Sequence, residues 1–272
     1  MNNPAVNKAT MRISIITINY NNGDLLEATI KSVIEQTFPD YEYIVIDGGS
    51  ADDSVSIIRK YSNHISYWVS EKDKGIYNAM NKGILKATGD YCLFLNSGDT
   101  FYENDTLKNA VERLDADFVC GNVLLVYPSG TALWKAPDAV DPLFFIQRLS
   151  LCHQSLFIKT ESLKQRSYDE SLKIAADWEQ VFYEILINHR TYKKLDAIVC
   201  RYLSDGVSSD DAKSDAEKRM ILDKYRSLGY IEQDELLELV YKLKVGTRKY
   251  RLALVVIRMI VNGGKLLRKW KN

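Results

Sequence analysis

Residues 12–19 read RISIITIN and lead directly into the polar residues YNN at 20–22. An isoleucine-rich run of this length predicts a strand that is buried on both faces, as in a parallel sheet. The same pattern recurs at 41–46, where YEYIVI precedes DGGS, and at 91–95, where YCLFL precedes NSGD. Helical patterns separate these runs. The first hundred residues therefore predict a parallel α/β sheet wrapped by helices.

Helix ends and further elements follow from capping residues and apolar spacing. Asp24 is the expected N-cap of the first helix, with Glu27 completing a capping box, and Pro39 ends the helical pattern. The other predicted elements are helices at 53–61, 75–87, 143–149, 178–187, 211–227, 233–244 and 248–267, and strands at 65–69, 117–127, 155–159 and 195–202.

Each of the first four predicted strands ends in a polar cluster. These clusters are NYNN, DGGS, EKD and NSGD. Ligands of open α/β sheets bind beyond the carboxyl ends of the strands, which all lie at one edge. A single polar loop after a strand is ordinary. Four in series, each with Asp or Asn, favour a binding site.

Composition excludes several classes of protein. The 272 residues carry 36 basic and 36 acidic side chains, which argues against a nucleic-acid binder held by overall charge. The four cysteines are scattered without CxxC spacing, which indicates reduced thiols and no disulfide framework. The first residues lack a signal-peptide core, and no apolar run approaches the roughly 18 residues of a spanning helix. We therefore expect a cytoplasmic protein.

The chemistry of the polar edge is constrained by missing motifs. Neither GxGxxG nor GxxxxGK[ST] is present, so a diphosphate bound here would need its charge met in another way. A divalent cation, Mg²⁺ or Mn²⁺, is the simplest partner, and such ions prefer carboxylates and phosphates. Asp99 offers that carboxylate. HExxH and zinc-finger spacings are absent, so zinc is not expected.

Several motifs in order carry a family resemblance. ITINYNNGDLLEATIKSVIEQTF, YEYIVIDGGSADDS, SEKDKGIYNAMNKGILKATGDYCLFLNSGD, CHQSLFIK and YDESLKIAADWEQ resemble the family 2 glycosyltransferases over about three quarters of the chain. The resemblance implies a GT-A fold: a Rossmann-like α/β/α sandwich with a mostly parallel central sheet. It implies this domain over residues 1–210, with a nucleotide-sugar half at about 12–100 and an acceptor half at about 101–210. Residues 211–272 are then a helical, basic and amphipathic C-terminal extension.

The resemblance also implies an inverting transferase that uses a UDP-sugar and acts on a glycan or lipid-linked acceptor in surface polysaccharide biosynthesis. NSGD takes the place of the metal-binding DxD motif, but Asp99 is its only carboxylate. The residues implied to bind the nucleotide sugar are Thr17, Asn19, Tyr20, Asp47, Asp73 and Asn96, with Asp99 on a Mn²⁺ or Mg²⁺ ion.

On the acceptor side, Asp177 matches the catalytic base of the family. An N-cap role is its plain structural alternative. His153 and Gln154 match an HQ pair near the acceptor, although a lone histidine is more often structural. Trp178 could stack on a sugar, but a helical tryptophan beside Phe182 is more often core.

The C-terminal residues leave two alternatives open. No acid follows Glu238, whereas ten lysines and arginines do, and apolar residues share one predicted helix face. Such a helix suits peripheral contact with anionic lipid. It also suits packing on the domain or on a second subunit in a homodimer.

Two other functions compete with the transferase. Because NSGD has fewer carboxylates than a DxD motif, a non-catalytic nucleotide-sugar-binding protein is the alternative. A nucleotidyltransferase is the third reading, but its glycine-rich phosphate loop is missing after the first strand. The donor sugar, the acceptor and the linkage are not expected to be readable from sequence.

Overall fold

The computed structural model describes residues 11–203 and 211–230. These residues fall into two compact units. The first contains 11–139, 150–203 and 211–218, and the second contains 140–149 and 219–230. The site described below lies entirely within the first unit.

The first unit is built on one mixed sheet whose strand order is β3-β2-β1-β4-β8-β6-β9-β5, with β7 paired to β6. β1, β2, β3 and β4 are mutually parallel, and β6 is parallel to β9. β8 is antiparallel to both β4 and β6. The strands are β1 (Ile13–Asn19), β2 (Tyr41–Asp47), β3 (Tyr67–Ser70), β4 (Tyr91–Phe94), β5 (Thr100–Phe101), β6 (Phe118–Tyr127), β7 (Gly130–Trp134), β8 (Leu156–Lys159) and β9 (Tyr192–Leu203).

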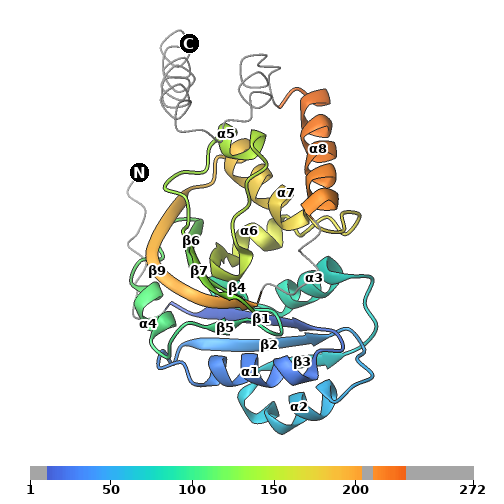
Figure 1. Cartoon of the computed structure of the whole chain (residues 1–272), viewed down its shortest axis with the longest axis vertical. Coiled ribbons are helices and arrows are strands. Elements are labelled where there is room, and N and C mark those ends of the chain that lie inside the picture. Colours follow the sequence, from blue (N-terminus) through green and yellow to red (C-terminus); the bar gives the residue numbers. More distant parts are fainter. Residues whose placement is uncertain (1–10, 204–210, 231–272) are drawn as a thin grey trace. The chain divides into compact units, whose positions relative to one another are not determined.

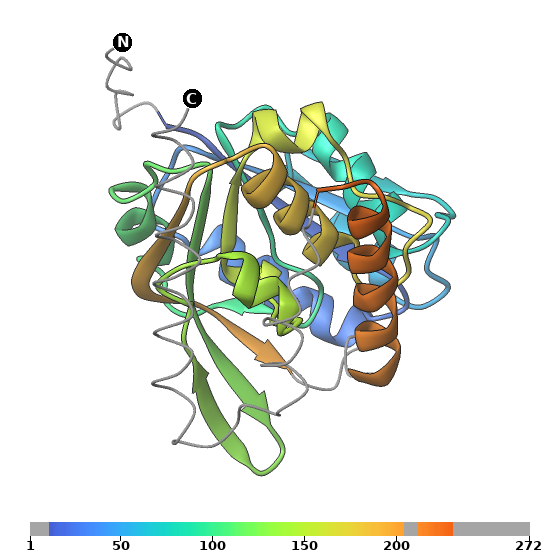
Figure 2. The ribbon, with the colours of Figure 1, turned by 90° about the horizontal axis from the view of Figure 1, so that it is seen from above.

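Helices cover both faces of the parallel strands. Figure 1 shows α1 and α2 on one face and α3 on the other, and α3 also packs against α6, as Figure 2 shows from above. The helices are α1 (Gly23–Ile34), α2 (Ser54–Lys60), α3 (Ile76–Lys86), α4 (Thr106–Val111), α5 (Pro142–Ile146), α6 (Thr160–Gln165), α7 (Ala176–Phe182) and α8 (Asp211–Ser227), with short 3-10 helices at Ser62–His64 and His153–Ser155 and a π-helical segment at Tyr183–Ile187. This arrangement confirms the predicted α/β sandwich.

The core forms where the predicted apolar runs meet. β1 is buried along its whole length, and the apolar side of α1, with Leu26, Ile30 and Val33, packs against the sheet. On the opposite face α3 approaches β1 closely at Gly83. A Cβ there would lie 2.5 Å from Cγ2 of Ile16, so only glycine fits without a shift.

The predicted capping box of the first helix is wrong. α1 begins at Gly23 with Asn22 as N-cap, and the side chain of Asn22 does not cap it; the amide of Gly23 donates instead to Oδ2 of Asp52 at 2.9 Å. Glu27 points elsewhere: its carboxylate accepts hydrogen bonds from Lys60 Nζ at 2.8 Å and from the Tyr61 hydroxyl at 2.6 Å. The tertiary contact with the end of α2 therefore outcompetes the local cap. Four short elements of two to six residues, β5, β7, α4 and α6, were not predicted.

The second unit contains α5 and the last part of α8. In α5 the rings of Phe144 and Phe145 pack edge to face with centroids 5.3 Å apart. Tyr225 and Tyr230 form a similar pair at 6.0 Å.

Part of the predicted C-terminal extension can be compared with the structure. α8 matches the helix predicted over 211–227, whereas the predicted helices at 233–244 and 248–267 lie outside the described residues. Among the described helices none combines the length and apolar character that crossing a membrane requires. The predicted boundary near residue 210 stays a prediction.

Candidate active site

The ends of β1, β2 and β3 meet at one buried carboxylate. Asp47 is fully buried at the end of β2 and accepts hydrogen bonds from Asn19 Nδ2 at 2.7 Å and from Ser70 Oγ at 2.6 Å. Ser50 donates both its backbone amide and its hydroxyl to the same carboxylate. Burial alone would raise the pKa of Asp47, but these donors outweigh it and the pKa is lowered. Asp47 is therefore a fixed negative charge that joins three strand ends.

Two accessible side chains lie beside Gly48, the residue that follows Asp47. Tyr20 is 66% exposed, and a Cβ added to Gly48 would lie 3.2 Å from its ring and 2.5 Å from Oδ2 of Asp73. The absence of a side chain at Gly48 thus lets Tyr20 and Asp73 approach the same stretch of backbone. The structure brings Asn19, Tyr20, Asp47 and Asp73 together at one edge, as the sequence predicted from their positions after the strands.

Thr17 lies elsewhere. Its side chain is fully buried in β1, where the hydroxyl donates to the carbonyl of Leu95 at 2.6 Å and lies 3.0 Å from the hydroxyl of Tyr43. These contacts assign Thr17 to the interior of the sheet, where it joins β1 to the chain after β4, and not to a nucleotide-facing surface.

The NSGD segment folds into a tight turn after β4. The amide of Asp99 donates to the carbonyl of Asn96 at 2.9 Å, and Gly98 has φ 104°, which matches glycine at the third position of a type II turn. Thr29 and Asn22 hold the turn against α1, because Gly98 N–H donates to Thr29 Oγ1 and Asn22 Nδ2 donates to the carbonyl of Ser97.

The carboxyl group of Asp99 is almost fully buried. The residue is 5% exposed, and this burial raises the pKa of its carboxyl to about 7, although the electrostatic interaction with His153 and a hydrogen bond from Gln154 act in the opposite direction. A buried carboxyl of this kind lacks a full countercharge from the described part of the protein.

His153 connects the NSGD turn to Asp177. Its Nε2 lies 3.0 Å from Asn96 Nδ2, and its Nδ1 lies 3.5 Å from Oδ2 of Asp177. Because an amide nitrogen only donates, this network assigns the ring proton to Nδ1, facing the carboxylate. The structure therefore brings together Asn96, His153 and Asp177, which are far apart in the chain.

Asp177 lies in the first turn of α7, which begins at Ala176, and so it is not the N-cap of that helix. Its side chain remains 24% exposed. Burial would raise the pKa of Asp177, but hydrogen bonds from His153, Tyr77 and the amide of Trp178 outweigh it and lower the pKa. The carboxylate is thus ionised at neutral pH and able to accept a proton.

Tyr77 is a site residue that sequence reasoning missed. It lies in the first turn of α3, and its hydroxyl donates to Oδ1 of Asp177 at 2.9 Å across 100 residues of chain. The signal available was its place directly after the EKDKG loop, at the polar edge of the sheet. Sequence spacing alone could not pair it with Asp177.

Trp178 is part of the packing. It is 4% exposed, and its ring stacks on Phe182 with centroids 5.8 Å apart and an interplanar angle of 15°. This is the core position that was the alternative to a sugar platform.

The described residues can be tested for a divalent cation. They contain no group of three or more His, Cys, Asp or Glu side chains that could hold a metal ion. The buried Oδ1 of Asn96 nevertheless has no hydrogen-bond partner in the described part of the chain, and Asp99 lacks a full countercharge. These two oxygen donors fit a hard cation that takes its other ligands from phosphate and water.

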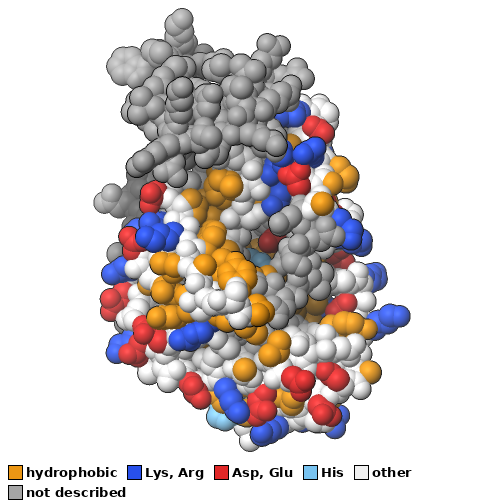
Figure 3. All heavy atoms as spheres, viewed as in Figure 1, with side chains coloured by type: hydrophobic (Ala, Val, Ile, Leu, Met, Phe, Trp, Pro, Cys, Tyr) orange, Lys and Arg blue, Asp and Glu red, His pale blue; other side chains and the backbone are white. Residues whose placement is uncertain are grey.

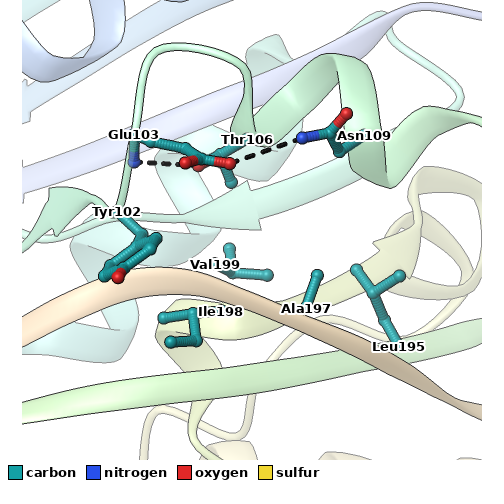
Figure 4. Close-up of a pocket in the computed structure, with 8 residues that line it drawn as sticks. All are labelled: Tyr102, Glu103, Thr106, Asn109, Leu195, Ala197, Ile198 and Val199. Atoms are coloured by element: carbon teal, nitrogen blue, oxygen red, sulfur yellow. Dashed lines mark hydrogen bonds between the residues drawn. The ribbon is translucent and has the colours of Figure 1, made fainter.

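A pocket elsewhere in the first unit contains none of the predicted site residues. It lies between β9 and the segment around α4, and Figure 4 shows its apolar floor and the polar side chains of Glu103, Thr106 and Asn109 at its rim. On the face drawn in Figure 3, acidic and basic side chains are interspersed around α1 and α2, in keeping with the balanced charge.

Comparison with known proteins identifies the family. The model of Glycosyl transferase family 2 matches residues 14–173. An uncharacterised glycosyltransferase of Mycobacterium tuberculosis is 35% identical over 206 residues, which cover 72% of this chain and 77% of that protein.

Two solved structures share the fold. The Staphylococcus aureus TarS structure in complex with UDP-GlcNAc has a TM-score of 0.58 and 20% identity, covering 80% of this chain and 73% of that one. The Pyrobaculum calidifontis mannosyltransferase PcManGT in complex with GDP-Man and Mn²⁺ has a TM-score of 0.57 and 17% identity, covering 96% and 83%. The fold is therefore that of GT-A glycosyltransferases. Together with the family match over more than half of its length, this shows that the chain is a glycosyltransferase of family 2.

Proposed function

We propose that this enzyme is an inverting transferase that moves a hexose or N-acetylhexosamine from a UDP-sugar to a glycan or lipid-linked acceptor in surface polysaccharide biosynthesis. The observation that carries the proposal is the link through His153, which contacts both Asn96 of the NSGD turn and Asp177. One imidazole thereby couples the place of the leaving diphosphate to the carboxylate that would activate the acceptor.

The donor would bind along the edge formed by the first four strands. Tyr20 and Asp73 lie beside the backbone of Gly48, where a nucleoside could stack and hydrogen-bond. Asp47 and Asn19 set the charge and shape of that end, and the buried Oδ1 of Asn19 has no partner among the described residues. The UDP-GlcNAc bound by TarS, a protein of the same fold, supports this class of donor.

Asn96 and Asp99 would hold the divalent cation. A bound Mn²⁺ or Mg²⁺ neutralises charge on the leaving diphosphate. The Mn²⁺ in the PcManGT complex supports this assignment.

Asp177 is the proposed general base. Its Oδ1 accepts from Tyr77 and its Oδ2 faces His153, and each carboxylate oxygen keeps a second lone pair for the acceptor hydroxyl. The hydroxyl loses its proton to this carboxylate as its oxygen attacks the anomeric carbon, and the bond to phosphate breaks on the opposite face. The base needs to be ionised beforehand, which its lowered pKa provides.

The test is a panel of UDP-sugars with Mn²⁺ and candidate acceptors, followed by UDP release. Asp177→Asn should lower kcat by about 10² to 10⁴-fold, the usual contribution of general base catalysis, and leave donor binding intact. Asp99→Ala should weaken metal-dependent donor binding. Asp196→Asn, an exposed change in β9, is the matched control. Wild-type turnover in Asp177→Asn would remove the base assignment, and donor binding without turnover in the wild type would remove the transferase proposal.

We also propose that the basic residues after 241 attach this cytoplasmic enzyme to the inner face of the membrane, which suits a lipid-linked acceptor. Support comes only from their charge and apolar spacing. A flotation assay with anionic vesicles would compare the full chain with one that ends at Lys244. Equal behaviour would favour the alternative, packing on the domain or in a homodimer.

A further inference from the structure

A carboxylate from α8 holds the backbone that leads into α7. Oε1 of Glu217 accepts the amide of Lys173 at 2.8 Å, and Oε2 accepts the amides of Ile174 and Ala175, each at 2.7 Å. Three successive backbone amides therefore donate hydrogen bonds to one side chain, which lies more than forty residues further along the chain. All four residues belong to the first unit.

These amides lie directly before the proposed base. Ala175 is the N-cap residue of α7, which has no side-chain cap of its own, and Asp177 follows two residues later. Hydrogen bonds from N–H groups to a charged carboxylate are stronger than those between neutral partners. Glu217 thus fixes the direction in which the chain enters α7 and, with it, the starting point of the Asp177 side chain.

The neighbouring residue of α8 contacts the same region. The ammonium of Lys218 donates to Ser150 Oγ at 2.6 Å and lies 6.0 Å from the ring centroid of Trp178, the residue after Asp177. Consecutive side chains of α8 therefore contact the backbone before the proposed base and the ring after it.

We propose that Glu217 is a positioning residue for glycosyl transfer: it acts through the backbone of 173–175 to hold Asp177 against His153 and Tyr77. The inference rests on the proposed role of Asp177 as base. Contacts of 2.9 Å to Tyr77 and 3.5 Å to His153 require a defined position of the carboxylate. A displacement of about 1 Å in a reacting group can cost about 10²-fold in rate.

The experiment measures turnover, donor binding and local exchange in the full chain. Glu217→Ala removes both acceptor oxygens and with them all three hydrogen bonds, whereas Glu217→Gln keeps one carbonyl oxygen and replaces the other with a donor. We expect kcat to fall by about 10 to 10²-fold in Glu217→Ala, with an intermediate value in Glu217→Gln. The melting shift produced by UDP and Mn²⁺ should be unchanged, because the donor edge is built from other elements.

Hydrogen exchange supplies a readout that does not depend on activity. The amides of Lys173, Ile174 and Ala175 should exchange faster in Glu217→Ala, while amides of β1 and β2 keep their protection. Asp223→Ala is the matched control, since it removes an exposed carboxylate of the same helix that pairs with Arg226. It should leave both kcat and exchange at 173–175 unchanged.

The outcomes separate this inference from the proposed function. Wild-type kcat and exchange in Glu217→Ala, beside an inactive Asp177→Asn, would overturn the positioning role alone. Full activity of Asp177→Asn would overturn the base assignment and the positioning role together. If Glu217→Ala does not fold, Glu217→Gln decides by the same comparison: lowered kcat with unchanged donor binding supports the role, and wild-type kcat overturns it.

Discussion

At the scale of single residues, the environment of Asp177 decides what its carboxylate can do. Tyr77 donates to one oxygen and His153 faces the other, and both contacts favour the ionised form over the protonated one. Hydrogen bonds to a charged group contribute about 1.5–3 kcal/mol each, enough to offset the cost of burying the charge. The proposed base is therefore charged before an acceptor arrives.

Tyr77→Phe tests this arrangement. Losing the hydroxyl removes a hydrogen bond that lowers the pKa of Asp177, so that pKa rises and the carboxylate becomes protonated at higher pH. We expect the acid limb of the kcat–pH profile to move to higher pH, with kcat lowered several-fold at neutral pH. Tyr127→Phe, on the exposed end of β6, is the control. An unmoved acid limb would show that Tyr77 does not tune the base.

At the scale of elements, Glu42 in β2 joins three segments of the sheet. Its carboxylate accepts the hydroxyl of Ser14 in β1 at 2.5 Å, the hydroxyl of Thr88 at 2.8 Å, and the amides of Thr88 and Gly89 in the turn before β4. A Cβ on Gly89 would lie 2.7 Å from the carbonyl of Arg12, so the turn fits tightly against β1. These contacts fix the turn between α3 and β4, and so they set the direction of the strand that NSGD follows.

The free energy of unfolding should depend on the charge of Glu42. Burial raises the pKa of Glu42, but the hydrogen bonds from Ser14, Thr88 and Gly89 lower it by more than burial raises it. The folded pKa therefore lies below the reference value of 4.5. A lowered folded pKa stabilises the protein above the unfolded pKa, and this contribution is lost as the pH falls through the folded value.

We therefore expect Glu42→Gln to be less stable than the wild type at pH 7, by about 2 kcal/mol from the lost charge-assisted hydrogen bonds. The difference should shrink as the pH falls below 4.5. Urea unfolding at pH 7 and at acid pH measures it. Glu161→Gln, whose carboxylate accepts a hydrogen bond from the exposed Gln165 in α6, is the control. A stability difference independent of pH would contradict the proposed linkage.

At the scale of the whole molecule, the sheet itself unites the two halves of the site. Its parallel part, β3-β2-β1-β4, presents the proposed donor residues, and the antiparallel strand β8 joins β4 to β6 beside the turn that carries His153. The proposed donor edge and the proposed base belong to one compact unit, and a ligand at either should stabilise that unit.

UDP with Mn²⁺ should raise the melting temperature of the chain. At about 100 times its dissociation constant a ligand adds about 2.7 kcal/mol, and for a domain of this size that corresponds to about 5–10 °C. The shift should shrink when EDTA removes the cation. A larger shift with GDP than with UDP would contradict the proposed donor class.

The sequence by itself determined the parallel α/β sheet and the edge at which its polar residues gather. Buried strands that end in polar residues are local patterns, and the carboxyl ends of parallel strands share an edge by geometry. Asn19, Tyr20, Asp47 and Asp73 accordingly come together as predicted. Local pattern failed where a distant partner competed, as at Glu27, whose contacts with Lys60 and Tyr61 replace the expected cap.

Only the tertiary structure decided which residues complete the site. Tyr77 meets Asp177 across 100 positions, and Glu217 meets Ala175 across 42, so no periodicity or spacing could pair them. The same holds for Thr17, whose position in the motif says nothing of its burial beneath Tyr43. Hydrogen bonds between elements depend on how the helices pack against the sheet. That packing exists only once the core has formed.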